Sequence, residues 1–481
     1  MKTLIQGGYV VGFDGKEHEV IRDGVVVFEN DRIAHVGKQY TGPVDKKIEA
    51  SGCLVSPGFI DTHFHSGINA GDYLLNEPGK LDYFASNYLA HGAPTREGEK
   101  HAHLKDIDVG QRFSLIHLLK SGVTTTLEIG GPGGNPEAYV EMVDQVGIRC
   151  YTGPSYKNVN FYHDREGRLE YDWDDERGKE GLRRAIAFAK KFNGACTGRM
   201  GTMLFPGHVD SCTPELLMET RKAAQDVGVR VQIHATINLF EFHTVMKRDR
   251  CTPIEMLRKI GFLDPEVSLS HCIFITGHSW LSYPYGDDLK IIADCGASVA
   301  HSPLKYLKLG ITMESFDRYL KAGINIGIGT DTFPKDIISD MRYAALCSRV
   351  AEKSFIAGHP RDVFNAATLG GAKMVGREDI GRLQKGAKAD IAVVNLRDIA
   401  FGAVRDPIKA LVETAVSRDV RTVIVDGEVL VDNGRYLRIN EGELLDKVQA
   451  KGEEVWASVP KWHWTGKGVD EVLPPAFKMI D

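Results

Sequence analysis

The sequence predicts an α/β fold: a (β/α)₈ barrel carrying a small β-sandwich built from both ends of the chain. Residues 58–385 alternate short apolar runs with amphipathic helical stretches, and eight such runs can be counted. Many of the helical stretches end at glycine, which is typical of a helix C-terminus. Residues 1–57 and the residues after 385 instead hold short runs rich in Val and Ile, separated by Gly, Asp and Asn. Eight strand–helix units of this length match a (β/α)₈ barrel with insertions.

The predicted barrel strands are the eight apolar runs. They are GFIDTHF (58–64), TTTLEI (124–129), IRCYTGP (148–154), GTMLFPG (201–207), VRVQIHA (229–235), VSLSHC (267–272), ASVAHSP (297–303) and INIGIGTD (324–331). Two long stretches, 66–105 and 155–180, are expected as loops over the face of the barrel where the strands end.

Four segments are expected along the chain. Residues 1–57 form the first part of the β-sandwich, 58–385 the barrel, 386–440 the second part of the sandwich, and 441–481 a C-terminal helix and tail. The stretch VDGEVLVDNG in the third segment predicts a hairpin with tight glycine turns.

Composition excludes several classes of function. The 481 residues are 43% hydrophobic and 26% charged with a formal net charge of −6, and no basic stripe suggests a nucleic-acid partner. The apolar N-terminal stretch is broken at Gln6, Gly7 and Gly8, so it lacks a signal-peptide core, and the chain has no apolar run long enough to span a membrane. None of the 8 cysteines forms a CxxC pair, which indicates reduced thiols in a cytoplasmic protein.

The first candidate site is the motif Asp61-Thr62-His63-Phe64-His65, which follows an apolar run. Alternate residues on a strand share a face, so the two imidazoles point the same way. At the C-terminal end of a barrel strand that direction leads to the active face. Two imidazoles on one face are half of a metal site, although an HxH pair alone also fits two surface histidines.

Three further polar residues stand at the ends of other predicted strands: His234, His271 and Asp331. Each alone would fit an ordinary polar residue at a strand end. Together with the HxH pair they place candidate ligands at the ends of four barrel strands, which predicts an active site. Imidazole and carboxylate ligands suit zinc, iron, cobalt or manganese.

These motifs resemble the amidohydrolase superfamily. The resemblance includes PGFID before the HxH pair, GTDT around Asp331, and the stretches 300–310 and 365–396, and it covers nearly the whole chain. Within the superfamily, the single-metal branch with cytosine and guanine deaminases and triazine hydrolases is the most similar. The resemblance implies His63, His65, His234 and Asp331 as ligands of one divalent metal ion, zinc first among the candidates. It implies His271 as an acid/base or oxyanion-polarising residue, beside the catalytic Asp331.

A second metal ion would need a bridging residue. Binuclear members of the superfamily use a lysine or glutamate at the end of the third or fourth strand, and the fourth run, GTMLFPGHVD, has no lysine. Lys157 lies beyond the end of the third strand. One metal ion is therefore expected. His208 is a further candidate for the site, with a plain loop histidine as the alternative.

The sequence departs from the deaminase pattern at one position. Deaminases of this branch carry a glutamate three residues after the fifth-strand histidine, where it protonates a ring nitrogen, but here that position is Ile237. Glu241 is expected inside the next helix and directed away from the site. Thr236 and Asn238 could either bond substrate or cap the helix.

Two hydrolytic functions are compatible with this site. The missing glutamate favours a hydrolase that cleaves a C–N or C–S bond of an N-substituted urea, amide or thiocarbamate, similar to the phenylurea and molinate hydrolases. The alternative is an aminohydrolase or chlorohydrolase acting on a heteroaromatic ring such as a triazine, cytosine or guanine. A barrel that has lost activity is a third hypothesis, against which the intact set of polar residues argues.

The expected partner is a small molecule, with no nucleic acid and no membrane. Apolar residues of the 66–105 insertion could line its pocket or pack elsewhere: Tyr73, Leu74, Leu75, Tyr83, Phe84, Tyr88 and Leu89. Similar enzymes are usually dimers or larger assemblies, so a homo-oligomer is expected.

Overall fold

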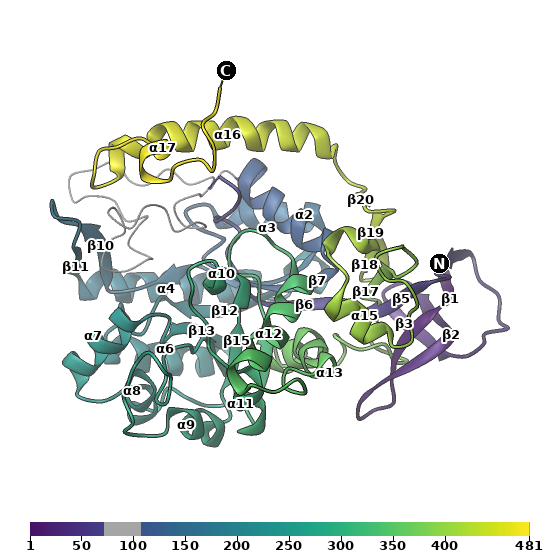
Figure 1. Cartoon of the computed structure of the whole chain (residues 1–481), viewed down its shortest axis with the longest axis horizontal. Coiled ribbons are helices and arrows are strands. Elements are labelled where there is room, and N and C mark those ends of the chain that lie inside the picture. Colours follow the sequence, from purple (N-terminus) through teal and green to yellow (C-terminus); the bar gives the residue numbers. More distant parts are fainter. Residues whose placement is uncertain (72–106, 481) are drawn as a thin grey trace.

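The computed structural model describes residues 1–71 and 107–480. Its centre is a barrel of parallel strands, and a second sheet lies at one side of it (Figure 1). The barrel strands are β6 (Phe59–Phe64), β7 (Val123–Ile129), β8 (Arg149–Gly153), β12 (Met200–Pro206), β13 (Arg230–Ala235), β14 (Val267–His271), β15 (Ser298–His301) and β16 (Ile326–Ile328). All eight predicted runs are confirmed as strands.

The barrel strands pair in the order of the chain, each parallel to the next. The first and last strands meet through a parallel bridge between Phe64 and Asp331. This arrangement places the C-terminal ends of all eight strands on one face, where (β/α)₈ enzymes carry their active sites.

Helices follow the barrel strands along the chain. They are α2 (Arg112–Lys120), α3 (Pro136–Val146), α4 (Asp175–Phe192), α5 (Ala195–Gly198), α6 (Pro214–Val227), α7 (Leu239–Asp249), α8 (Pro253–Lys259), α9 (Asp288–Cys295), α10 (Pro303–Leu307), α11 (Phe316–Lys321), α12 (Ile337–Glu352), α13 (Pro360–Asn365) and α14 (Gly371–Met374), and α12, α13 and α14 come after the last strand. The side chains of Asn135 and Thr213 cap the first turns of α3 and α6, and Gly147 and Gly228 end these helices with left-handed backbone. These two glycines therefore end helices in the structure, as the sequence predicts.

The segment 155–180 is not the loop that the sequence predicts. β9 (Ser155–Tyr156) is followed by an antiparallel hairpin of β10 (Val159–His163) and β11 (Leu169–Trp173), and α4 begins at Asp175. The turn of the hairpin contains Gly167 at φ +76°, a conformation that glycine adopts without strain. Strands this short, with polar and aromatic residues in place of an apolar run, give a weak signal in the sequence.

Both ends of the chain meet in one nine-stranded sheet. It contains β1 (Lys2–Phe13), β2 (His18–Glu29), β3 (Arg32–Gly37), β4 (Lys46–Glu49), β5 (Cys53–Pro57), β17 (Ile391–Asn395), β18 (Val420–Val425), β19 (Glu428–Asp432) and β20 (Arg435–Tyr436). Antiparallel pairing of β5 with β17 joins the two halves, and β18 and β19 form the predicted hairpin. One apolar cluster draws on β1, β2, β3, β5, β17 and β18, so the halves share a core.

A buried ion-pair network connects this sheet to the barrel. Arg149, at the start of β8, lies 3.2 Å from Asp390 and 2.6 Å from Asp426, and its side chain is 1% exposed. A buried guanidinium requires such partners, since an unpaired charge in this position would be strongly destabilising. The network lies at the N-terminal ends of the strands, opposite the candidate site.

The C-terminal part of the chain contributes α16 (Glu441–Trp462), which crosses the molecule near α2 (Figure 1). Lys120 of α2 lies 2.7 Å from Glu441, and the Trp456 indole donates to the carbonyl of Gly71 at 2.9 Å. Two short helices, α15 (Pro407–Glu413) and α17 (Val469–Val472), complete the C-terminal part.

All eight cysteines are free thiols. Across the described ranges, no helix combines the length and the apolar character that a membrane span requires.

Candidate metal centre

The five predicted site residues come together at the C-terminal ends of β6, β13, β14 and β16. Asp331 is the common neighbour: its carboxylate lies 4.0 Å from His63 Nε2, 3.8 Å from His65 Nε2 and 3.9 Å from His271 Nε2. Potential ligand atoms of His63, His234 and His271 also lie within 4.8 Å of one another. The structure therefore gathers these residues as the sequence predicts.

The His65 and His234 rings face each other through Nε2 atoms that are 3.3 Å apart. His234 donates its Nδ1 proton to the carbonyl of Gly207 at 2.8 Å, which leaves Nε2 as a lone pair. Two imidazole nitrogens on one tetrahedral zinc ion, at about 2.0–2.1 Å from it, would be roughly 3.3 Å apart. The donor set and its spacing therefore fit a divalent metal ion.

Two polar side chains contact Nδ1 of His63. Its Nδ1 lies 3.2 Å from Gln232 Oε1 and 2.9 Å from Ser270 Oγ. The opposite nitrogen, Nε2, is buried and has no hydrogen-bond partner among residues 1–71 and 107–480. An acceptor behind a metal-binding histidine fixes its tautomer and its orientation. Nε2 of His63 is thus presented as a free ligand atom.

His271 and Asp331 have an unusual backbone. Their φ angles are +81° and +57°, in a region that non-glycine residues seldom adopt. Neither ring nitrogen of His271 has a hydrogen-bond partner within the described part of the chain, although the ring is fully buried. Strained backbone and unsatisfied buried polar atoms are typical of functional sites, where a ligand completes the bonding.

Burial disfavours the charged form of these imidazoles. It lowers the pKa of His65 to about 3, and it is also the main cause of the lowered pKa values of His63, His234 and His271. Neighbouring imidazoles add to the effect at His234 and His271 because a second positive charge nearby is unfavourable. Neutral imidazole is the form that binds a metal ion.

His208, for which the sequence analysis allowed either a place in the site or a plain loop position, lies next to the clustered imidazoles. Its ring stacks on that of His234 with centroids 4.3 Å apart, and its ligand atoms lie within 4.8 Å of those of Asp210 and Glu241. Burial raises the pKa of both Asp210 and Glu241, and the Asp210 carboxylate raises the pKa of Glu241 further, by less than burial does. The pair therefore retains a proton more readily than isolated carboxylates would.

The expectation that Glu241 faces away is wrong. Glu241 lies in the first turn of α7, but its carboxylate turns back and accepts hydrogen bonds from the amides of Thr236 at 2.9 Å and Ile237 at 2.8 Å. Asn238 caps the helix by accepting from the Glu241 amide. Ile237 itself is 2% exposed and packs in the main apolar core. These two hydrogen bonds from the amides that precede α7, rather than contact with solvent, determine the direction of Glu241.

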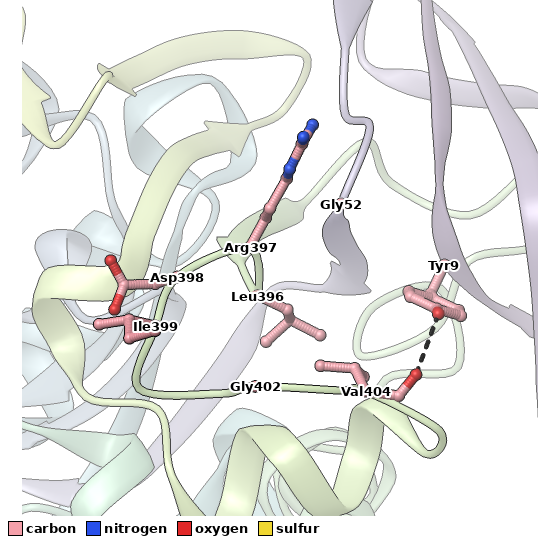
Figure 2. Close-up of a pocket in the computed structure, with 8 residues that line it drawn as sticks. All are labelled: Tyr9, Gly52, Leu396, Arg397, Asp398, Ile399, Gly402 and Val404. Carbon is pink, nitrogen blue, oxygen red and sulfur yellow. Dashed lines mark hydrogen bonds between the residues drawn. The ribbon is translucent and has the colours of Figure 1, made fainter.

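Lys157 lies near the His208 group. Its Nζ is 3.9 Å from the centre of the Phe161 ring, and its positive charge adds to burial in lowering the pKa of His208. The apolar residues of the insertion, Tyr73 to Leu89, lie outside the described residues. A pocket of about 520 Å³ opens near Tyr9, Arg397 and Val404, where the Tyr9 hydroxyl donates to the Val404 carbonyl at 3.4 Å (Figure 2). It contains none of the clustered imidazoles, so it is not the candidate site.

Gln232, Ser270 and Lys335 are site residues that the sequence analysis missed. Gln232 shares a face of β13 with His234, so the spacing along that strand held a signal. Ser270 directly precedes His271, and the alternation of side chains along a strand gives no such signal there. Lys335, four residues after Asp331, donates to the carbonyls of His65 and Asp331.

Comparison with known proteins agrees with this geometry. The model of the amidohydrolase family matches residues 54–430. The 5'-deoxyadenosine deaminase of Methanosarcina mazei is 27% identical over 95% of this chain and 99% of its own length. The 5-methylthioadenosine/S-adenosylhomocysteine deaminase 2 of Archaeoglobus fulgidus is 30% identical over 89% of this chain and 94% of its own length.

Two solved structures share the fold. Atrazine chlorohydrolase from Arthrobacter aurescens TC1, complexed with zinc, has a TM-score of 0.78 and 24% identity, covering 94% of this chain and 100% of that one. An adenosine deaminase from Xanthomonas campestris with bound zinc has a TM-score of 0.76 and 18% identity, covering 94% and 98%.

A parallel barrel with imidazoles and a carboxylate at its strand ends defines a metal-dependent hydrolase. The chain belongs to the amidohydrolase family. The similarity to phenylurea and molinate hydrolases stays a prediction, since the relatives described above are deaminases.

Proposed function

We propose that this protein is an aminohydrolase that uses water to replace an amino group on a heteroaromatic ring by a hydroxyl group and releases ammonia. Aminopurine nucleosides are its proposed substrate class. The alternative function given by the sequence thereby takes first place. Its main support is the group of deaminase relatives that match nearly the whole chain, taken together with the buried cluster around Asp331.

In this proposal His63, His65, His234 and Asp331 hold one divalent metal ion, zinc in the first place. When bound, such an ion lowers the pKa of a water molecule toward about 7 and polarises the carbon that is attacked. Asp331 and His271, whose nearest side-chain atoms are 3.9 Å apart, would take the proton that the attacking water loses and pass it to the departing ammonia. His271 can receive the proton, since it enters the reaction as a neutral imidazole.

A ring substrate also needs a proton at its nitrogen, and Ile237 cannot supply one. His208 is the described residue best placed for that role, because it stacks on His234 and has Asp210 and Glu241 next to it. The raised pKa values of this carboxyl pair keep a proton available beside the imidazole. We propose that the His208 group takes over the role that the missing glutamate has in related deaminases.

The buried Ile237 favours a second candidate function. Hydrolysis of an N-substituted urea, amide or thiocarbamate attacks a carbonyl or thiocarbonyl carbon and needs no protonated ring nitrogen. The same metal ligands, with His271 and Asp331, would suffice for it.

The experiment that separates them is turnover of the zinc-loaded enzyme on 5'-deoxyadenosine, 5'-methylthioadenosine, a chlorotriazine, an N-aryl-N'-methylurea and a thiocarbamate. Ammonia and released alkyl- or arylamine are quantified separately. The proposal predicts ammonia from the purine nucleosides, and none from an Asp331→Asn control. Amine release from the urea or thiocarbamate without ammonia from any purine would contradict it and establish the second candidate. No turnover on any class, with no bound metal, would favour an inactive barrel.

A further inference from the structure

Lys335 is a fully buried lysine directly beside the candidate metal centre. It lies between β16 and α12, four residues after Asp331, and its exposed fraction is 0%. Burial of an ammonium group is unfavourable unless hydrogen bonds and opposite charge compensate for the lost water. A lysine at such a position therefore points to a role that an apolar side chain could not fill.

The described contacts of the ammonium are directed at the backbone of two proposed ligands. Nζ donates to the carbonyl of Asp331 at 2.9 Å and to the carbonyl of His65 at 3.1 Å. It also lies 4.5 Å from the centre of the Phe64 ring, whose face favours a cation. All three partners are in or next to the two strands that close the barrel.

The closure of the barrel depends on the same atoms. His65 donates its amide to the Asp331 carbonyl at 3.0 Å, and Asp331 donates its amide to the His63 carbonyl at 2.9 Å. These two backbone bonds connect the first and the last strand, and Thr330 also donates to the Asp61 carboxylate across the same junction. The Asp331 carbonyl thus accepts from both His65 and Lys335, while Asp331 has φ +57°. A residue with this strained backbone stays in place only where its surroundings fix it.

We infer that Lys335 is a positioning residue that fastens His65 and Asp331 to each other through their backbone carbonyls, so that both side chains face one metal ion. The inference rests on the proposed metal site. The ammonium acts through two ligands and does not itself touch the ion. It bridges the ends of β6 and β16, whose proposed ligands are far apart in the sequence.

The test compares metal affinity with stability in Lys335→Met, which has similar length but no charge and no donor. Lys388→Met is the matched control. Lys388 is also largely buried, and its Nζ lies 2.9 Å from Asp31 and 3.0 Å from Asp426, in the second sheet. Both variants lose a buried ammonium, but only one of them loses contacts to proposed ligands.

The zinc dissociation constant of each metal-free protein is measured by competition with a chromophoric chelator, and the melting temperature is measured in parallel. Loss of an outer partner of a metal ligand weakens binding by about 10- to 100-fold, so this increase is expected for Lys335→Met. Lys388→Met should melt earlier than the wild type but bind zinc with unchanged affinity. Lys335→Arg, which keeps a donor and the charge, should bind more tightly than Lys335→Met.

An unchanged zinc dissociation constant in folded Lys335→Met would overturn the inference. If methionine prevents folding, Lys335→Gln gives the same comparison, and an unchanged constant there has the same meaning. A wild-type protein that binds no zinc would instead contradict the metal site itself, so the two failures are distinguishable.

Discussion

His65 and His234 present their Nε2 atoms to each other at 3.3 Å across the mouth of the barrel. The two residues come from the first and the fifth strand, 169 positions apart in the chain. His234 Nε2 carries a lone pair because the Nδ1 proton of this ring is donated to the Gly207 carbonyl. A cation held by both Nε2 atoms accounts for so close a contact, and the predictions below test that account.

Replacement of Asp331 by asparagine should abolish turnover while leaving the fold intact. The change is nearly isosteric, so circular dichroism and the melting temperature should stay close to the wild type. The loss of the carboxylate removes a metal ligand and the proton acceptor next to His271, so the rate should fall by orders of magnitude. Near-normal turnover in this variant would refute the proposed roles.

His271→Ala should retain the metal ion and lose rate. In the proposal this imidazole moves a proton and the other three histidines bind the ion, so metal content should stay near that of the wild type while kcat falls. The comparison is metal analysis of purified protein alongside steady-state kinetics. Loss of the metal would make His271 a ligand, which its 3.9 Å separation from Asp331 also permits.

Glu241→Gln should lower the free energy of unfolding by about 1–3 kcal/mol, because one of two buried amides loses its acceptor. The two amides are those of Thr236 and Ile237, which both donate to the Glu241 carboxylate. Glu255→Gln is the matched control: Glu255 caps α8 in a similar way through the Thr252 amide, away from the site. Urea unfolding measures both variants.

If Glu241 also holds a proton for His208, Glu241→Gln should lose deaminase activity as well, whereas Glu255→Gln should not. A Glu241→Gln protein with wild-type stability would show that the cap contributes nothing. One with wild-type turnover on a purine nucleoside would remove Glu241 from the proposed proton relay.

Zinc binding near pH 5.5 should release few protons from His65 and His234. An ordinary histidine, with a pKa of about 6.5, is mostly protonated at about pH 5.5 and must lose that proton to bind metal. Burial instead lowers the pKa of His65 to about 3, so this ring is already neutral there, and it lowers the pKa of His234 well below the ordinary value. Calorimetry in two buffers of different ionisation enthalpy counts the protons. Release of two or three would contradict the effect of burial.

The sequence predicted the barrel and the main cluster because both depend on local patterns. Each strand is a short apolar run, and His63, His234, His271 and Asp331 are polar residues at the ends of such runs. The glycines at the ends of the predicted helices separated one strand–helix unit from the next.

The supporting residues could not be predicted in the same way. Gln232 contacts His63 across 169 positions, and Lys335 contacts His65 across 270, so their partners are known only once the barrel has closed. Glu241 was misplaced because its helical position suggested an outward side chain, whereas the helix cap turns it back. The segment boundaries at 57, 385 and 440 and the homo-oligomer remain predictions.

The most direct test of the central claim is to titrate metal-free enzyme with zinc while following turnover of a purine nucleoside and the zinc bound per chain. The account predicts no activity without metal, a linear rise in activity, and a plateau at one zinc ion per chain. Activity that survives complete removal of metal would contradict it, and so would a plateau reached only at two ions per chain.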